Sequence, residues 1–331
     1  MDTVPNPTGG ADYSARRRSG DSLALVVPAE CAGLRADQAL TRLLPEHSRS
    51  RLQAWMRRGR VTRNGTPVAP RDKVWNGDQL DVETEPAPEV LSTLPEDIPL
   101  DIVFEDAAIL VVNKPTGLVV HPGSGNMCGT LQNAVLAHAP ETAHVPRSGI
   151  VHRLDKDTSG LMVVAKTLAA QVSLVRQLQV RSIKREYIAL VHGEVPQDGA
   201  VDAPIGRHPV SRTRMAVVAV GKPARTHYRV VERFDGITLL RLALETGRTH
   251  QIRVHMASIG HPLVGDAVYG RTALPAYCPR HAGDFPRQAL HAEALGLRHP
   301  ASSLVMRWTA PLPEDMRTLL AALRVHRGSS T

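Results

Sequence analysis

Residues 149–160, which read GIVHRLDKDTSG, constrain the fold more than any other part of this chain. A glycine opens the stretch, a glycine closes it, and the uninterrupted apolar run of residues 161–165 follows. Five ionisable side chains fill six neighbouring positions: His152, Arg153, Asp155, Lys156 and Asp157. Apolar residues at 150, 151 and 154 indicate that this charged loop is held against the protein interior. Polar loops carried by a buried strand often bear catalytic groups, so the rest of the chain is expected to support this loop.

The positive charge of the chain is unevenly distributed. Over all 331 residues, Lys and Arg exceed Asp and Glu by 8, which points to an anionic partner. Residues 41–73 alone carry nine basic side chains, namely Arg42, Arg49, Arg51, Arg57, Arg58, Arg60, Arg63, Arg71 and Lys73. They carry only two acids, Glu46 and Asp72, so this segment has a surplus of seven and the remaining chain is nearly neutral. The basic character is therefore assigned to a module near the N-terminus.

Composition also narrows the setting in which the protein works. The chain has 42% hydrophobic and 22% charged residues, as an ordinary soluble globular protein has. Three widely spaced cysteines form no CxxC pair, which disfavours a disulfide framework and favours a reducing cytoplasm. No apolar run approaches the roughly 18 residues of a membrane span. Arg16-Arg17-Arg18 before a short apolar run is similar to an export signal, but that run is shorter than the roughly 7–15 residues expected.

Four segments are predicted along the chain: a disordered arm over 1–20, a compact module over 21–85, a linker over 86–99 and a larger domain over 100–326. In the module, Asp37 is a plausible N-cap of a helix bearing Leu40, Leu43 and Leu44. Ser48 or Ser50 can cap a second helix that Gly59 ends. Asn64-Gly65 and Asn76-Gly77 predict tight turns between short strands.

The second helix carries a basic surface. The arginines at 49, 51, 57, 58 and 60 lie off the apolar stripe of Leu52, Trp55 and Met56, and Arg63 follows. A solvated helix face is the simple alternative, but arginines without interleaved acids repel one another unless a polyanion accepts them. We therefore expect nucleic acid to bind here. Aromatic residues make up only 3% of the chain, which favours phosphate contacts on structured RNA over base stacking along a single strand.

The larger domain is predicted to be α+β with a mixed, mostly antiparallel sheet. Strands are expected at 102–104, 109–112, 161–165, 187–191, 226–231, 238–244 and 252–255. Helices are expected at 130–138, 168–178 and 316–323. Strands outnumber helices and no regular βαβ alternation is present. Residues 270–287, with three prolines and little pattern, are expected to form a surface excursion.

Asp155 is the main candidate for a catalytic group. A lone aspartate in a loop is usually a turn former, but Arg153 lies two residues away and a second polar segment offers partners. If residues 252–255 form a strand, Gln251, Arg253 and His255 project from one face. Arg253 can then pair with Asp155 and favour its ionised form in a secluded site. Tyr187 lies at the start of another strand, and from its position alone core packing with the hydroxyl at the edge is the favoured interpretation.

Other chemistries find little support. The chain has 15 histidines but no HExxH or similar ligand spacing, so no metal site is expected. The serines lack a GxSxG elbow. The glycine-rich residues 117–129 match neither GxxxxGK[ST] nor GxGxxG, so no nucleotide cofactor is expected.

Several long segments together resemble the RluA-type RNA pseudouridine synthases. They are NKPTGLVVHPGSGN, GIVHRLDKDTSGLMVVAKT, REYIALVHG and RLALETGRTHQIRVHMASIGHPLVGDAVYG, and they occur in the family's order. The segment SRSRLQAWMRRGRVTRNG, between two helices and a hairpin, resembles the S4-type RNA-binding domain. The likeness runs from about residue 23 to residue 324 and departs at 270–287 and in a short C-terminus.

The resemblance implies an isomerase that makes pseudouridine from uridine in RNA without cofactor or metal. It implies that Asp155 is the essential aspartate, that Tyr187 contacts the target base and assists proton transfer, and that Arg253 pairs with the aspartate. His152 and Arg153 would line the site, with Arg153 filling the gap left by the extracted base. The arginines at 49, 51, 57, 58, 60 and 63 would contact the RNA backbone.

The implied substrate is 23S rRNA at helix 69, as naked RNA or in a large-subunit precursor. A tRNA or another rRNA site is the alternative substrate, and a non-catalytic ribosome-assembly factor is the alternative class of protein. Attack of the aspartate at C1′ and an elimination path both remain open. A monomer is expected, since no spare amphipathic helix or heptad repeat is present.

Overall fold

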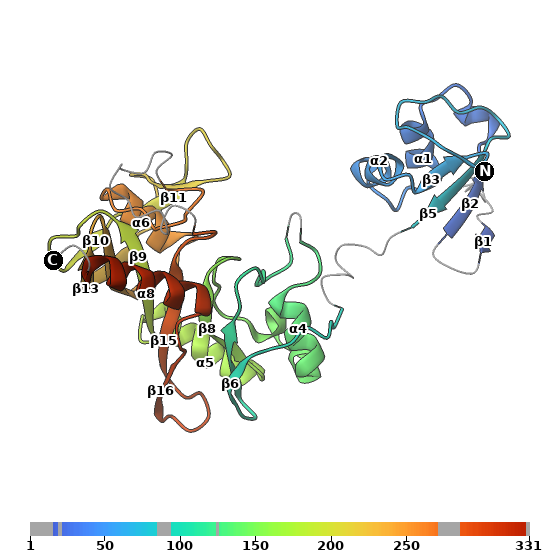
Figure 1. The fold of residues 1–331 in the computed structure, drawn as a ribbon. Coiled ribbons are helices and arrows are strands. Elements are labelled where there is room, and N and C mark those ends of the chain that lie inside the picture. Colours follow the sequence, from blue (N-terminus) through green and yellow to red (C-terminus); the bar gives the residue numbers. More distant parts are fainter. Residues whose placement is uncertain (1–15, 19–21, 85–93, 124–125, 271–284, 329–331) are drawn as a thin grey trace, which may run out of the picture. The chain divides into compact units, whose positions relative to one another are not determined.

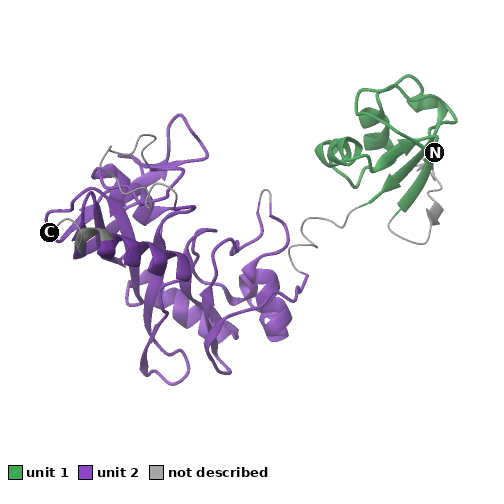
Figure 2. Ribbon diagram, viewed as in Figure 1, with its two compact units in different colours: residues 1–87 green, residues 88–331 purple. Residues whose placement is uncertain are grey.

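The computed structural model describes residues 16–18, 22–84, 94–123, 126–270 and 285–328. The chain divides into two compact units, Met1–Ala87 and Pro88–Thr331 (Figure 2). Of the helices described, none is both long and apolar enough to cross a membrane.

The N-terminal unit is a small sheet with two helices (Figure 1). Its strands are β1 (Arg16–Arg18), β2 (Ser22–Val26), β3 (Val61–Arg63), β4 (Thr66–Pro67) and β5 (Gln79–Glu83). They pair antiparallel in the order β1-β2-β5-β3-β4. The helices are α1 (Ala36–Leu43) and α2 (Arg49–Arg57). Leu40, Leu52, Trp55 and Leu80 are buried in one apolar cluster, so the helices cover the sheet through the stripe that their sequence predicts.

Two predictions for this unit need correction. Disorder over 1–20 does not hold for Arg16–Arg18, which pair with β2; the rest of that arm lies outside the described residues. Asp37 is not an N-cap, because α1 begins after Arg35 and the Asp37 side chain is fully buried. The cap of α2 is as predicted: the Ser48 hydroxyl accepts a hydrogen bond from the Arg51 amide.

The C-terminal unit is built on a nine-stranded sheet. Its central path runs β10-β13-β14-β9-β15-β8-β7-β6, and β16 pairs with β15. The strands are β6 (Ile102–Glu105), β7 (Ile109–Lys114), β8 (Ser159–Ala165), β9 (Lys184–His192), β10 (Gly199–Asp202), β13 (Arg225–Phe234), β14 (Ile237–Leu244), β15 (Leu290–Arg298) and β16 (Val305–Thr309). Among the described strands of this sheet, only β8 and β15 run parallel. The mixed, mostly antiparallel α+β fold expected from the sequence is confirmed.

Helices cover the faces of this sheet. They are α4 (Leu131–His138), α5 (Leu168–Gln179), α6 (Gln251–Ser258) and α8 (Glu314–Gly328). A two-stranded ribbon, β11 (Ile205–Arg207) and β12 (Met215–Val217), lies beside α6. Strand β8 is buried along its whole length: Met162 and Val164 enter one apolar cluster, while Leu161 and Val163 enter another. A strand covered on both faces requires the continuous apolar run seen after Gly160.

The prediction of a strand at 252–255 is wrong, because these residues lie in helix α6. Six consecutive side chains of this helix are buried, so its apolar residues show no one-sided period. The other predicted strands lie within β6, β7, β8, β9, β13 and β14, and the predicted helices correspond to α4, α5 and α8. Strands β15 and β16 were not predicted. Of the expected excursion at 270–287, residues 271–284 lie outside the described residues.

Part of the predicted linker is attached to the C-terminal unit. The Asn133 side chain donates a hydrogen bond to the Leu94 carbonyl at 2.8 Å, and the Glu96 amide donates to the Asn133 carbonyl at 3.1 Å. The Gly129 amide donates to the Glu96 carboxylate at 2.8 Å. Residues 94–96 are therefore bound at the start of α4.

Candidate active site

The charged loop is fixed at both ends by close backbone packing. Gly149 has φ +76°, and a Cβ there would lie 1.8 Å from the Ala165 carbonyl oxygen. Gly160 has φ +116°, and a Cβ there would lie 2.3 Å from the Ala292 carbonyl oxygen. No side chain fits at either position. The two glycines are what allow the loop to lie against the ends of β8 and β15.

Two buried basic side chains hold the middle of the loop. Lys114 donates hydrogen bonds to the carbonyls of Lys156, Pro115 and Leu118 at 2.6–2.9 Å. Burial lowers the pKa of Lys114 to about 7, although three carbonyl acceptors suit the three N–H groups of the ammonium ion. Arg287 donates to the Asp157 carbonyl at 3.1 Å and forms an ion pair with Asp315. These contacts fix the backbone on the C-terminal side of Asp155.

Asp155 meets Arg253 of α6 in the predicted ion pair. Arg253 Nη1 donates to Asp155 Oδ2 at 3.0 Å. The same guanidinium makes two hydrogen bonds to Asp266, at 2.7 and 2.9 Å. Asp266 is fully buried, Arg253 is 7% exposed and Asp155 is 16% exposed. Burial opposes ionisation of both Arg253 and Asp266, but their mutual attraction dominates, raising the pKa of Arg253 and lowering that of Asp266.

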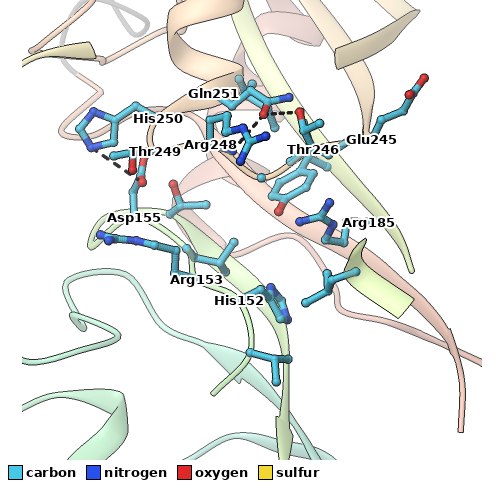
Figure 3. Close-up of a pocket in the computed structure, with 18 of the residues that line it drawn as sticks. His152, Arg153, Asp155, Arg185, Glu245, Thr246, Arg248, Thr249, His250 and Gln251 are labelled. Atoms are coloured by element: carbon cyan, nitrogen blue, oxygen red, sulfur yellow. Dashed lines mark hydrogen bonds and ion pairs between the residues drawn. The ribbon is translucent and has the colours of Figure 1, made fainter. Parts of the chain in front are cut away.

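The second oxygen of Asp155 faces His250. His250 Nε2 lies 3.9 Å from Asp155 Oδ1 (Figure 3). His250 Nδ1 lies 2.8 Å from the Tyr269 hydroxyl, which also accepts a hydrogen bond from the Met215 amide at 2.9 Å. The guanidinium of Arg253 lies 5.1 Å from the Tyr269 ring centre. His250, Asp266 and Tyr269 were not singled out from the sequence, although all three lie in the quoted segment that ends GDAVYG.

A cavity of about 620 Å³ opens beside Asp155. Tyr187 and Arg185, two positions apart on β9, line it together. Burial is the main cause that raises the pKa of Tyr187, and the charge of Asp155 raises it further. Tyr187 is thus a neutral phenol at the cavity wall, within the reach of the charge on Asp155.

His152 and Arg153 also line the cavity, but in different ways. His152 Nε2 accepts a hydrogen bond from the Val163 amide at 3.1 Å, and burial lowers the pKa of His152 to about 3. Its Nδ1 is buried without a partner among the described residues. Arg153 is exposed, and in Figure 3 it points away from His152. His152 is therefore a neutral wall residue, whereas Arg153 is a cation at the opening.

Comparison with known proteins assigns this site to a family. The family model described as RNA pseudouridylate synthase matches residues 108–258, which include Asp155, Tyr187 and Arg253. A protein of Nitrosomonas europaea, named ribosomal large subunit pseudouridine synthase D, is 54% identical over 98% of this chain and 96% of its own length. The chain belongs to the RluA-type RNA pseudouridine synthases. It is an isomerase that converts uridine in RNA to pseudouridine.

Further similarities agree with this assignment. A synthase of the same name from Pseudomonas aeruginosa is 56% identical over 91% of this chain and 95% of its own length. The solved structure of human RNA pseudouridylate synthase domain containing 1 is 27% identical and covers 73% of this chain and 98% of its own, with a TM-score of 0.52. That of domain containing 4 shares the fold, with a TM-score of 0.54 over 72% of this chain and 95% of its own, at 24% identity.

The cavity of the synthase is rich in arginine. Six arginines line it: Arg147, Arg153, Arg181, Arg185, Arg248 and Arg253. The acids among its lining residues are Asp155 and Glu245. The sequence placed the basic character only at 41–73, and the structure corrects this by gathering arginines from distant segments at a second surface. A phosphate backbone is the natural counterpart of such a wall.

The arginines of α2 in the N-terminal unit differ in their surroundings. Arg49 donates to the buried carboxylate of Asp37 at 2.7 Å, and Arg35 and Gln53 donate to the same group. These donors outweigh burial and lower the pKa of Asp37. Arg51 lies over the Trp55 ring at 5.0 Å. Arg49 therefore forms an ion pair with Asp37 inside the N-terminal unit.

Arg57 and Arg58 are exposed at the end of α2, and Arg60 and Arg63 follow in partly exposed positions. Arg57 donates to the Gln53 side chain at 3.2 Å, and Arg63 donates to the Lys73 carbonyl. In the described part of the chain, no group of three His, Cys, Asp or Glu side chains is placed to hold a metal ion.

Proposed function

We propose that this synthase isomerises uridine in the 23S rRNA of the large ribosomal subunit, at helix 69, with Asp155 as the catalytic residue. The observation that carries the catalytic part is the geometry of Asp155. One of its oxygens is held by Arg253, while Oδ1 faces a cavity lined by arginines and by Tyr187. The names of the relatives support the ribosomal substrate.

The arrangement suits the bond changes of the reaction. The C1′–N1 bond of the target uridine breaks, the uracil turns within the cavity, and C5 bonds to C1′ while its proton leaves and N1 gains one. An ionised carboxylate serves this chemistry either by attacking C1′ or by removing a sugar proton in an elimination. Tyr187, a protonated phenol at the wall, contacts the base and assists proton transfer. Arg253 acts through Asp155, whose orientation it fixes.

The target base must leave its stack to reach Asp155, which costs a few kcal/mol. Arg153, exposed at the opening, fills the gap that the base leaves, and His152 forms part of the cavity wall. The N-terminal unit acts as an S4-type domain that docks structured RNA through Arg51, Arg57, Arg58, Arg60 and Arg63. In this proposal Arg49 shapes that surface through Asp37. The enzyme works as a monomer in the cytoplasm, where its substrate is made.

The variant Asp155→Asn tests the catalytic proposal. It is isosteric, so the protein should fold with an unchanged melting temperature. With RNA labelled with tritium at uridine C5, the parent releases tritium and Asp155→Asn releases none. Asp235→Asn, an exposed acid in the β13–β14 turn, is the matched control and should keep parental activity. Tritium release by Asp155→Asn at the parental rate would reject the role of Asp155.

Mapping of pseudouridine in RNA from cells lacking this protein tests the target. The uridines of helix 69 should lose their modification, while tRNA sites keep theirs. Loss of pseudouridine at a tRNA site or at another rRNA site would show that this RNA, rather than helix 69, is the substrate. Restoration of growth by Asp155→Asn to the parental level would favour a non-catalytic role in ribosome assembly.

A further inference from the structure

Helix α5 exposes an apolar face to solvent. Leu168 is 56% exposed, Val172 is 50% exposed and Val175 is 37% exposed. Spacings of four and three residues place them on one side of the helix. The opposite side, with Ala170 and Leu174, is buried in the cluster that covers β8. The outward face of α5 therefore takes no part in packing this helix against the sheet.

This face is continuous with the active-site cavity. Val175 and Gln179 line the cavity beside Asp155, and both also line an adjoining hollow of about 290 Å³. The other residues of that hollow are Gln171, Val172 and Arg176, all on α5. A chain that leaves the cavity on this side passes directly over the helix.

The charges around α5 favour an anionic occupant. The helix contains no acidic residue, and Arg176 is exposed on it. Arg147, on the cavity wall, is held beside the helix because Gln171 donates a hydrogen bond to the Pro146 carbonyl at 2.7 Å. In the described part of the chain, no carboxylate forms an ion pair with Arg147 or Arg176.

The backbone at Arg147 is strained. Arg147 has φ +54° and Ser148 has φ +51°, both in the left-handed region. This conformation is unfavourable for residues other than glycine, and such strain gathers at functional sites. Arg147, which carries this strain, is one of the residues that line the cavity.

We propose that the outward face of α5, formed by Leu168, Val172, Val175 and Arg176 with Arg147 beside it, binds the RNA strand that flanks the target uridine. The inference rests on the proposed entry of RNA into the Asp155 cavity and adds a second contact area to it. Bases of that strand lie on the aliphatic side chains, and Arg147 and Arg176 bind the phosphates. Leu168 to Arg176 spans roughly 12 Å of helix, room for about three stacked nucleotides.

The double variant Val172→Asp/Arg176→Glu tests this surface. Its matched control is Val325→Asp/Arg317→Glu on α8, which changes one exposed valine and one exposed arginine of another helix. Binding is measured in the Asp155→Asn background, so that the RNA stays unconverted. The probes are an unmodified large-subunit rRNA fragment and versions shortened on the 5′ or the 3′ side of the target uridine.

The α5 variant should bind the full fragment about 10-fold or more weakly. Its salt slope should be smaller by about 0.7–0.9, because Arg176 no longer neutralises a phosphate. Shortening one flank should weaken binding to the parent by a similar factor and leave the α5 variant unchanged, because both changes remove the same interaction. The α8 control should behave as the parent throughout. Equal melting temperatures of the two double variants show that folding is not the cause.

If the α5 variant binds RNA with the parental affinity and salt dependence, the inference about α5 is wrong. If Asp155→Asn is inactive in that case, the proposed catalytic function still stands. An active Asp155→Asn enzyme would instead reject the proposed function and leave the binding result intact. Hydroxyl-radical footprinting of Leu168 and Val172 identifies the occupant. Protection by naked RNA is expected. Protection before RNA is added would assign the face to contact between copies of the chain, and either that result or no protection by RNA would overturn the inference.

Discussion

Arg253 donates hydrogen bonds from Nε and Nη2 to the two oxygens of Asp266, at 2.7 and 2.9 Å. Nη1 donates to Asp155, at 3.0 Å. One positive charge is therefore shared by two carboxylates, and the planar guanidinium fixes the angle at which Asp155 is held. Asp266 is therefore placed to orient the Arg253 guanidinium toward Asp155.

Arg253→Lys should lower the single-turnover rate about 100-fold or more. A lysine keeps the charge but cannot bridge two carboxylates with a planar fork, and small displacements of a catalytic group cost about 100-fold. Arg241→Lys, at the half-buried ion pair with Glu293, is the control and should stay within about twofold of the parent. A lysine variant at 253 with the parental rate at saturating RNA would show that charge alone suffices.

Tyr187→Phe should fold normally and lose about 100-fold or more in single-turnover rate, the usual contribution of a positioned proton donor or acceptor. Burial raises the pKa of Tyr187, so its phenol stays protonated throughout the working range. The parental rate should therefore show no titration of Tyr187 between pH 6 and pH 9.5. Rates measured across that range in both enzymes test this. A step below pH 9.5 that vanishes in the variant would contradict it.

His291 should remain neutral down to about pH 5. Its ring is almost fully buried, Nδ1 lies 2.8 Å from the Ser159 hydroxyl, and burial lowers its pKa to about 4. Below pH 6.5 the unfolded chain binds a proton that the folded chain does not, so stability falls on acidification. At pH 5 the loss is about 2 kcal/mol. The C2–H resonance of His291, assigned with His291→Gln, should not titrate between pH 5 and 8, and a midpoint near 6.5 would contradict burial as the governing effect.

Gly149→Ala should lower stability by several kcal/mol and slow catalysis, because the new methyl group meets the Ala165 carbonyl and displaces the loop. Gly260→Ala is the matched control. It also has a positive φ, +86°, but a Cβ there has nothing within 4 Å, so it costs only about 1 kcal/mol of backbone strain. Chemical unfolding and single-turnover rates separate the two. Equal losses would show that the left-handed backbone, rather than the close approach, makes Gly149 necessary.

The loop at 149–160 could be predicted because its evidence is local: two glycines, crowded charges and an apolar strand directly after it. Helix α6 could not, because it is buried on all sides and the alternation of Ile252, Val254 and Met256 fits a strand equally well. The partner of Arg253 was predicted despite this error, since a buried arginine needs a carboxylate in either secondary structure. Asp266 was not found, because nothing in the sequence shows that it shares Arg253 with Asp155.

For Asp37 the sequence does contain a signal, but that signal predicts the wrong structural role. An aspartate just before an apolar helical stripe is a usual cap signal. Its carboxylate is instead buried beneath Arg49 and Gln53 of α2 and Arg35, the residue before α1. A cap and a buried ion pair place the same residue type at the same point of the sequence, and only the packing of α1 on α2 distinguishes them.

The parallel pairing of β8 with β15 also fixes when the enzyme can become active. Ser159 and its partner His291 are 132 positions apart. At about 5–20 residues per second, a translating ribosome needs roughly 7–26 s between them. During that interval the loop bearing Asp155 has been made, but the strand that its closing glycine packs against has not. Catalytic competence is therefore among the last properties that the nascent chain acquires.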